Sequence, residues 1–326
     1  HRLFSAENTD APLFFSSNAI PAGPVPPHPA KEQSQASVPL LNIRDLSIEF
    51  PDASGRLRPV VSRLSLDLQP GEKAAIVGET GSGKSMLLLS ILRLLPANAR
   101  AGGSIRVLDQ DLFRFSPDEL RQYRRDTAAY IPQASGHALN PVLTSGFQIK
   151  ERLQAGRKNF SAGKAVLNSL SRAGFPEPEQ IKARYPHQLS GGMKQRVLAA
   201  MAICGTPDLI LADEPTKGLD PGAVDLMMEL FSGLDSAAVL TVTHDLTFAR
   251  SLNGRIIVML SGMIVEDARA SVFFDSPIHP YSKDLLAAWS GSGSPSSLPW
   301  KTGSILHSGP GCPYREHCTS AFQLCT

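Results

Sequence analysis

The sequence lacks a long uninterrupted hydrophobic run. A helix that spans a membrane needs about 18 consecutive apolar residues. The strongest run here extends from Met86 to Leu95 and is interrupted by Ser90 and Arg93. The chain is therefore not expected to cross a membrane by itself.

The sequence also has no excess of positive or negative charge and contains few aromatic side chains. The 32 Lys and Arg residues nearly balance the 30 Asp and Glu residues, so nucleic acid is not an electrostatically favoured partner. Aromatic residues make up only 6% of the chain, which argues against a surface that stacks bases. The hydrophobic share of 42% is ordinary for a folded protein. A chain of 326 residues is long enough for one large or two modest domains.

Cysteine is rare except at the C-terminus. Cys204 stands alone, whereas Cys312, Cys318 and Cys325 fall within the last fifteen residues. A secreted disulfide scaffold would distribute its cysteines along the chain, so we expect a reducing compartment. The three clustered thiols leave three alternatives open: solvated thiols, a zinc site, or ligands of an iron–sulfur cluster.

Residues 1–38 are rich in proline, alanine and serine. This composition buries too little apolar surface to offset the entropy of ordering, which predicts a flexible arm. A signal peptide is disfavoured because Leu13-Phe14-Phe15 is too short for its apolar region and no basic region precedes it. The sequence begins with His1, so the natural N-terminus is left open.

The remaining chain predicts an α/β fold. Apolar and polar residues alternate in two early segments, as in half-buried strands, and a buried strand is expected at 73–77 before a helix at 84–95. Ser116 with Glu119 forms a capping-box pattern. Helical patterns continue to about Cys204, and strands resume at 209–211, 239–242 and 256–260. This order predicts an α/β core with a helical subdomain inserted at about 112–204.

A glycine-rich loop follows the strand at 73–77. Its sequence, Gly78-Glu79-Thr80-Gly81-Ser82-Gly83-Lys84-Ser85, fits the phosphate-binding pattern G-x-x-x-x-G-K-[ST]. Glycines let the loop curl so that backbone N–H groups face an anion, Lys84 adds a cation, and the Ser85 hydroxyl can bind Mg²⁺. A Gly/Ser turn without a ligand is the alternative, but the position between a strand and a helix favours a nucleotide site.

Two carboxylates follow the strand at 209–211. Asp213 and Glu214 would lie at the carboxyl edge of a parallel sheet, where ligands of such sheets bind. Asp213 can hold Mg²⁺ through water and Glu214 can polarise an attacking water. Alone, two acids after a strand are usually a turn; beside a phosphate loop they indicate nucleotide hydrolysis.

Four further motifs carry a family resemblance. Leu189-Ser190-Gly191-Gly192-Met193-Lys194-Gln195-Arg196 resembles the signature of ATP-binding cassette (ABC) proteins, Tyr130-Ile131-Pro132-Gln133 resembles their Q-loop, Gly218-Leu219-Asp220 their D-loop and Thr243-His244-Asp245 their switch histidine. Together with the phosphate loop and the acidic pair, these motifs follow the family order over roughly residues 40–290.

This resemblance implies the fold class α/β: a P-loop NTPase (RecA-like) core with an inserted α-helical subdomain and an antiparallel β edge, plus a C-terminal extension. The expected domains are a flexible arm at 1–38, a nucleotide-binding domain at 39–290 and a Cys-containing extension at 291–326.

The resemblance also implies roles for the site residues. Lys84 and the loop amides would bind the phosphates of ATP, while Ser85, Gln133 and Asp213 would organise Mg²⁺. Glu214 would be the general base, with His244 holding the γ-phosphate and the attacking water. Outside this centre, the resemblance implies that Phe50 contacts adenine and that Asp220 of the D-loop belongs to the nucleotide site. It also implies that the ATP held by an opposite subunit is contacted by Ser190, Gly191 and Gly192.

One branch of the family resembles the chain most: the oligopeptide, dipeptide and nickel importers. Met193 in the signature, Leu139-Asn140-Pro141-Val142, the stretch Ile278–Leu286 and the C-terminal cysteines carry this resemblance. It implies an ATPase on the cytoplasmic face of the inner membrane, with two permease subunits, a second similar ATPase and an extracytoplasmic binding protein as partners. It also implies a [4Fe–4S] cluster on Cys312, Cys318, Cys325 and a fourth cysteine further along the chain, which the given sequence does not contain. His317 as a substitute ligand and a vacant fourth position are left open as alternatives.

Departures and rival interpretations accompany this resemblance. Lys217-Gly218 stands where many relatives have Thr-Ala or Ser-Ala. A soluble ATPase of the carbon–phosphorus lyase type resembles the same branch but lacks the cysteine tail. A chromosome-maintenance ATPase would need a coiled-coil insertion, and no sustained heptads occur between Phe113 and Ser190. An exporter with fused membrane segments does not fit the missing spans.

Overall fold

The computed structural model describes residues 38–133, 138–154, 162–290 and 311–325. Its centre is a six-stranded sheet in the order β10-β9-β3-β8-β7-β6, in which β9, β3, β8, β7 and β6 run parallel and β10 pairs antiparallel at one edge. Its strands are β3 (Lys73–Val77), β6 (Ala128–Ile131), β7 (Leu209–Asp213), β8 (Ala238–Val242), β9 (Arg255–Leu260) and β10 (Met263–Arg269).

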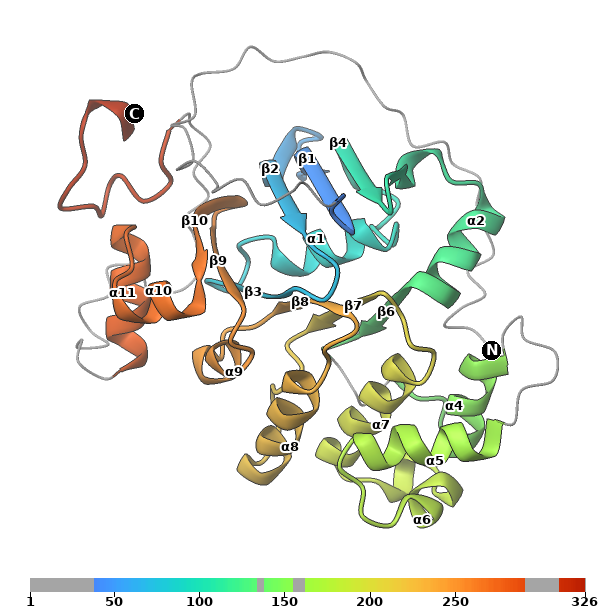
Figure 1. The fold of residues 1–326 in the computed structure, drawn as a ribbon. Helices are drawn as coiled ribbons and strands as arrows, with labels where there is room; N and C mark the ends of the chain where they lie inside the picture. The colour runs from blue at the N-terminus through green and yellow to red at the C-terminus, as the bar shows by residue number, and fades with distance from the viewer. Residues whose placement is uncertain (1–37, 134–137, 155–161, 291–310, 326) are drawn as a thin grey trace.

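A second, antiparallel sheet lies above the first, with α1 (Lys84–Ile91) between the two (Figure 1). Its order is β2-β1-β4-β5. The strands are β1 (Leu41–Pro51), β2 (Leu57–Leu68), β4 (Arg100–Val107) and β5 (Gln110–Asp111). This sheet is the predicted antiparallel β edge.

The side chains of the central sheet alternate between its two faces and belong to two separate apolar clusters. Ala74 and Ile76 of β3 face α1 and the antiparallel sheet, whereas Ala75 and Val77 face the helices on the other side. Because side chains of a strand alternate between faces, a short run of apolar residues is buried on both faces of the sheet. Packing on both faces therefore fixes the positions of these strands and of the residues that follow their carboxyl ends.

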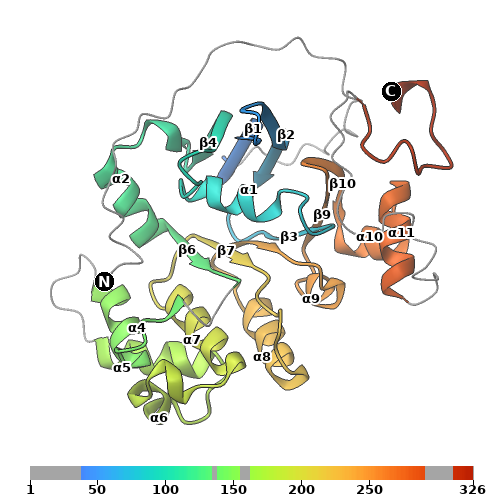
Figure 2. The same cartoon turned by 180° about the vertical axis from the view of Figure 1, so that it is seen from behind.

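Helices α4 to α9 lie on the face of the central sheet opposite α1, and α10 and α11 lie at the edge formed by β9 and β10 (Figure 2). In the inserted region, α4, α5, α6 and α7 pack around one another, and α8 and α9 lie under the sheet. The helices are α2 (Pro117–Gln122), α4 (Ser145–Gln154), α5 (Ala162–Arg172), α6 (Pro178–Ala183), α7 (Gly191–Ile203), α8 (Pro221–Ser232), α9 (Leu246–Ser251), α10 (Ala270–Asp275) and α11 (Pro280–Trp289). Single turns occur at Leu112–Arg114, Tyr123–Thr127, Pro186–Gln188 and Gln323–Cys325.

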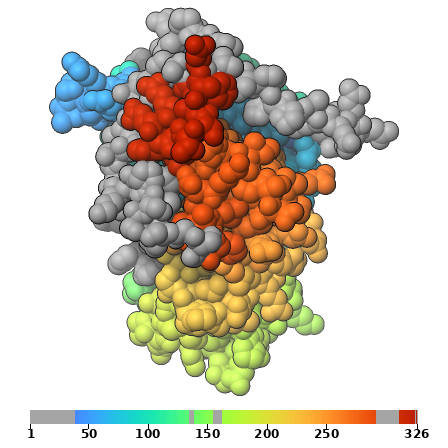
Figure 3. Space-filling view, turned by 90° about the vertical axis from the view of Figure 1, so that its left-hand side faces the viewer, coloured from blue at the N-terminus to red at the C-terminus, as the bar shows by residue number. Residues whose placement is uncertain are grey.

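The end of the described chain, residues 311–325, lies beside α11 (Figure 3). Tyr314 of this segment is 1% exposed and belongs to the same apolar cluster as Tyr281 of α11. The two rings meet edge to face with centroids 5.5 Å apart. The segment is thus anchored to the body of the protein by a buried aromatic pair.

Several local predictions are confirmed and several are wrong. The Ser116–Glu119 capping box is present at the start of α2. The helix expected at 84–95 ends at Ile91 instead, because Arg93 adopts φ +55° and bonds Leu112 O through its guanidinium. Strand β6 interrupts the region predicted to be helical at about 112–204, and β4 lies where no strand was predicted. No described helix is long and apolar enough to cross a bilayer. The predicted arm lies at 1–38, of which only Val38 is among the described residues.

Candidate functional site

The glycine-rich loop joins the end of β3 to the start of α1, at the carboxyl edge of the central sheet. Gly78, Gly81 and Gly83 have φ of +143°, +87° and +94°, a region that only glycine adopts readily. A Cβ at Gly78 would lie 2.1 Å from Met259 O, and one at Gly83 would lie 2.4 Å from Val60 O. The loop therefore needs glycine both for its conformation and for its close packing.

Lys84 is buried at the centre of this loop. Its side chain is 6% exposed, and its ammonium donates to Gly78 O at 2.9 Å and to Ser82 Oγ at 3.2 Å, with a further bond to Glu79 O. Burial lowers the pKa of Lys84, against the opposing effect of Glu214 and Asp213. The loop carbonyls hold this cation where the outer phosphates of a nucleotide would replace them as its partners.

Ser85 and Asp213 meet beside Lys84. The Ser85 hydroxyl donates to Asp213 Oδ1 at 3.1 Å, although the two residues are far apart in the sequence. Asp213 is 4% exposed, and burial raises the pKa of its carboxyl. A serine hydroxyl and a buried carboxylate are oxygen donors of the kind that Mg²⁺ prefers. The donor set therefore fits a magnesium ion carried in with the nucleotide.

Glu214 and His244 form a second pair at the same sheet edge. Glu214 Oε2 lies 2.6 Å from His244 Nδ1 and also accepts the His244 backbone N–H at 3.3 Å. Glu214 has φ +49°, and its own N–H donates to Val242 O at the end of β8. The left-handed backbone turns this carboxylate out of the strand direction and toward His244. The arrangement suits a base that deprotonates a water while the imidazole orients it.

The signature segment and the D-loop lie together on a different part of the molecule. Ser190 caps α7 by accepting the Met193 N–H at 3.2 Å, and Asp220 caps α8 by accepting the Ala223 N–H at 3.0 Å. A Cβ at Gly192 would lie 3.5 Å from Asp220 Oδ2. Ser190, Gly191 and Asp220 are exposed. Within the described ranges, no hydrogen bond connects the signature to the phosphate loop of the same chain.

Gln133 and Phe50 are less closely tied to the centre. Gln133 is exposed after β6, and the preceding carbonyl, Pro132 O, accepts from Gln195 of α7 at 3.4 Å. Phe50 is half-buried near the end of β1, opposite Arg58 of β2, and packs against the apolar cluster around α1. Among the residues that the structure describes, neither side chain forms a hydrogen bond with Lys84 or Asp213.

Two tyrosines near the site were not predicted to matter there. Tyr281 of α11 accepts the Glu79 N–H at 3.2 Å through its hydroxyl, and Tyr130 of β6 points its hydroxyl at Asp213 Oδ2, 3.5 Å away. Glu79 Oε1 is buried without a hydrogen-bond partner, and burial raises the pKa of this carboxyl. Tyr281 lies in a stretch that resembles the importer branch, which was the one signal available in the sequence.

The predicted cluster ligands do not form a metal centre. Cys312, Cys318 and Cys325 are half-buried free thiols. Among the residues that the structure describes, no three His, Cys, Asp or Glu side chains are grouped to hold a metal ion. The closeness of the three cysteines in sequence therefore does not by itself make a ligand set. The iron–sulfur prediction is not supported.

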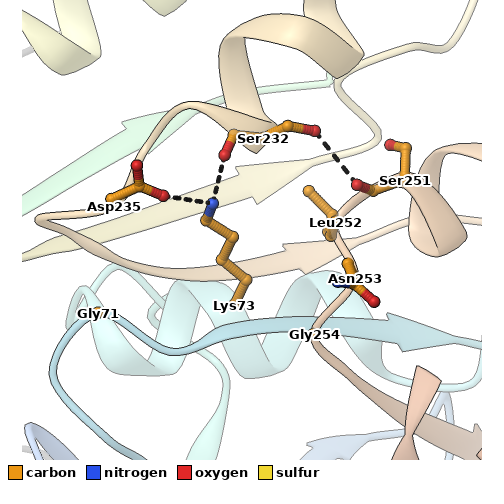
Figure 4. A pocket seen from close by; sticks show the side chains of 8 residues that line it. All are labelled: Gly71, Lys73, Ser232, Asp235, Ser251, Leu252, Asn253 and Gly254. Carbon is orange, nitrogen blue, oxygen red and sulfur yellow. Dashed lines mark hydrogen bonds and ion pairs between the residues drawn. The ribbon is translucent and has the colours of Figure 1, made fainter. Parts of the chain in front are cut away.

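A polar hollow at the opposite edge of the sheet is unrelated to this site (Figure 4). It has a volume of about 350 Å³ and lies at the amino ends of β3 and β9. Lys73 in its wall donates to Asp235 at 3.2 Å and to Ser232 O. Its cation is thus already paired, and the hollow lies away from the carboxyl edge where the nucleotide groups gather.

Fold and site together define a P-loop nucleotide-binding cassette. The family described as ABC transporter matches residues 61–217. The dimeric ATP-binding cassette MJ0796 in a post-hydrolysis state with ADP and phosphate is similar in structure, with a TM-score of 0.63, 28% identity, and coverage of 71% of this chain and 98% of that one.

Relatives of similar sequence identify the branch of the family. A Brucella abortus protein named for peptide import and ATP binding is 38% identical over 90% of this chain and 91% of its own length. The oligopeptide transport ATP-binding protein OppD of Escherichia coli is 34% identical over 91% and 90%, and the dipeptide transport ATP-binding protein DppD of the same organism is 41% identical over 76% and 78%. The chain belongs to the ABC transporter family, as an ATP-binding subunit of the oligopeptide/dipeptide importer branch.

Proposed function

We propose that this chain hydrolyses ATP to power the uptake of peptides through partner permeases. The observation that carries the proposal is the meeting of Lys84, Ser85, Asp213, Glu214 and His244 at one sheet edge. The relatives named above are transport proteins for peptides, which favours peptides over nickel or a metal chelate as cargo. They give no support to the carbon–phosphorus lyase alternative.

Each residue of this centre has a proposed task. Lys84 leaves its loop carbonyls and pairs with the outer phosphates of ATP, together with the backbone N–H groups of the loop. Ser85, Asp213 and Gln133 hold Mg²⁺, which neutralises phosphate charge when bound. Glu214 accepts a proton from the attacking water, and His244 orients that water. Phe50 stacks on the adenine from β1.

We further propose that a second, similar ATPase subunit completes the site. Ser190 and Gly191 place the N-terminus of α7, a helix of 13 residues, at an exposed position, and within the described ranges no hydrogen bond connects it to the phosphate loop of the same chain. A helix N-terminus favours an anion. In a dimer, Ser190, Gly191, Gly192 and Asp220 of one subunit would meet the ATP held by the other, so closure depends on ATP at the interface.

The permeases would dock on the helical region. Val142 and Phe147 are 74% and 48% exposed, and Phe147 also lines a hollow of about 630 Å³ between α4, α5 and α6. Exposed apolar side chains around a hollow are typical of a protein interaction surface. With permeases bound there, the chain would be a peripheral subunit on the cytoplasmic face of the inner membrane, served by an extracytoplasmic binding protein.

The test is a tagged pull-down of the full chain from detergent-solubilised membranes, with partners identified by mass spectrometry. We expect two polytopic permeases and a second ATPase, and a weakened recovery of the permeases when Phe147→Ser is used. Val272→Ser, at an exposed apolar residue of α10, is the matched control. Recovery with soluble enzyme subunits and without permeases would contradict the transport proposal.

A further inference from the structure

A tyrosine near the start of α11 contacts the beginning of the phosphate loop. The Tyr281 hydroxyl accepts the backbone N–H of Glu79 at 3.2 Å, although the two residues are 202 positions apart in the sequence. Glu79 is the second residue of the glycine-rich loop. The bond therefore joins a helix outside the nucleotide site to the backbone of the loop that is proposed to hold the phosphates.

Several contacts fix the position of Tyr281. It is 0% exposed, and its ring packs edge to face against Tyr314. Its backbone N–H donates to His279 Nδ1 at 3.1 Å, which caps α11. Just before this helix, the buried carboxylate of Glu266 in β10 accepts the N–H groups of Ile278 and His279 at 2.9 and 2.8 Å. Because β10 belongs to the central sheet and a packed interior has little free space, the hydroxyl is held in place relative to the sheet that carries the loop.

The backbone of Glu79 is held at both of its polar groups. Its N–H donates to Tyr281, and its carbonyl accepts from the Lys84 ammonium and, at 3.2 Å, from the Ser82 backbone N–H. Oε1 of the Glu79 side chain is buried without a hydrogen-bond partner among the described residues. The backbone contacts therefore fix this part of the loop.

The contacts of Glu79 differ in what nucleotide binding requires of them. Under the proposed function, Lys84 exchanges its loop carbonyls for the outer phosphates, so its bond to Glu79 O is lost when the nucleotide binds. The bond to Tyr281 requires no such exchange, because its acceptor belongs to α11 and lies outside the loop. A contact that is present before binding and is kept afterwards lowers the cost of ordering a binding loop.

We propose that Tyr281 is a positioning residue for nucleotide binding, whose hydroxyl keeps the phosphate loop in its binding-competent conformation before the nucleotide arrives. Without this hydroxyl, the Glu79 N–H loses its partner, and the loop spends part of its time in other conformations. The apparent Kd of a nucleotide rises in inverse proportion to the binding-competent fraction. The inference rests on the proposed binding of ATP at this loop, and it depends neither on peptide transport nor on a second subunit.

The experiment compares Tyr281→Phe with the wild type, each as the isolated full chain. The substitution removes the hydroxyl and keeps the ring that packs against Tyr314. We expect the Kd of a fluorescent ATP analogue to rise by about fivefold, as the loss of one hydrogen bond of typical strength would produce. Hydrogen–deuterium exchange should be faster in the peptide that covers the phosphate loop of the nucleotide-free variant. Saturating nucleotide should restore the protection seen in the wild type.

Tyr314→Phe is the matched control. Tyr314 is the other buried ring of the same aromatic pair, and its hydroxyl donates to Asp284 of α11. This variant also loses one buried hydroxyl, but it should keep the wild-type Kd and the wild-type exchange of the loop. In the membrane complex, Tyr281→Phe should raise the KM for ATP by about fivefold at unchanged kcat, because saturating ATP orders the loop.

Three results would overturn the inference and leave the proposed function intact. The first is an unchanged Kd for Tyr281→Phe in protein that unfolds cooperatively. The second is an equal rise in Kd for Tyr314→Phe, since packing of the aromatic pair and not the bond to Glu79 would then control the loop. The third is unprotected exchange of the loop peptide in the nucleotide-free wild type, a result that does not depend on any variant. A wild-type chain that binds no ATP analogue would refute both the inference and the proposed nucleotide site.

Discussion

The phosphate-loop region and the signature region of this cassette differ in how deeply their polar side chains are buried and in how many partners these side chains have within the same chain. Around the phosphate loop, Lys84 and Asp213 are 6% and 4% exposed, and each has partners from its own chain. In the signature region, Ser190 and Asp220 are exposed, and each caps only its own helix. The first region is preorganised for phosphates, whereas the second has an exposed helix N-terminus. Under the proposed function, binding would occur in one chain and hydrolysis would need two.

The largest expected effect is the loss of ATP hydrolysis when the proposed general base, Glu214, is replaced. Glu214→Gln keeps the shape of the side chain but removes the group that accepts a proton from water. We expect ATP hydrolysis to fall by about 10³-fold, with the Kd for ATP changed little. Phosphate release in the membrane complex measures the first quantity, and a fluorescent nucleotide measures the second. Glu229→Gln, at an exposed position of α8, is the control that should retain activity.

The second effect separates the two regions directly. Ser190→Arg places a large side chain at the start of α7, where a second subunit would contact its ATP. Hydrolysis in the complex should fall by about 10²-fold, while the isolated chain binds nucleotide as before. Ser171→Arg, at an exposed residue near the end of α5, is the matched control. A nucleotide Kd that worsens along with hydrolysis would mean that the signature serves its own chain.

The third effect is on the shape of the phosphate loop. Gly83→Ala introduces a Cβ 2.4 Å from Val60 O at a residue with φ +94°. We expect the free energy of unfolding to drop by about 2 kcal/mol, measured by urea denaturation. Gly163→Ala in α5 meets no atom within 4 Å and should be neutral or slightly stabilising. Equal stability of the two variants would contradict the proposed steric requirement.

The smallest expected effect is the change in stability when the buried carboxyl of Asp213 is replaced. Burial raises the pKa of Asp213 from its ordinary value of 3.8. Ionisation of this carboxyl therefore destabilises the folded state. The loss of stability is absent at a pH below the pKa of Asp213 in the unfolded chain, and it grows as the pH rises through the pKa in the folded protein. Asp213→Asn should stabilise the protein by about 1 kcal/mol at pH 7 and impair hydrolysis. Urea denaturation should show a gain that shrinks as the pH is lowered; a loss at pH 7 would contradict the assignment.

Local patterns were sufficient for the parts of the fold in which one stretch of sequence determines its own structure. The glycine loop, the strand that ends at Asp213 and the Ser116 capping box are of this kind. The early end of α1 depends on the bond from Arg93 to Leu112 O, and β4 contains two glycines that weaken a strand pattern. The contact of Tyr281 with Glu79 joins residues far apart in sequence, and no local pattern encodes such a pairing.

The most direct test of the central claim is peptide transport by the complex recovered through this chain. The complex, purified from membranes and placed in liposomes with its binding protein and a labelled peptide, should accumulate the peptide only when ATP is supplied. Glu214→Gln should abolish accumulation while leaving the complex assembled. Hydrolysis of ATP at the wild-type rate without movement of any peptide, or recovery of the chain without permeases, would contradict the account.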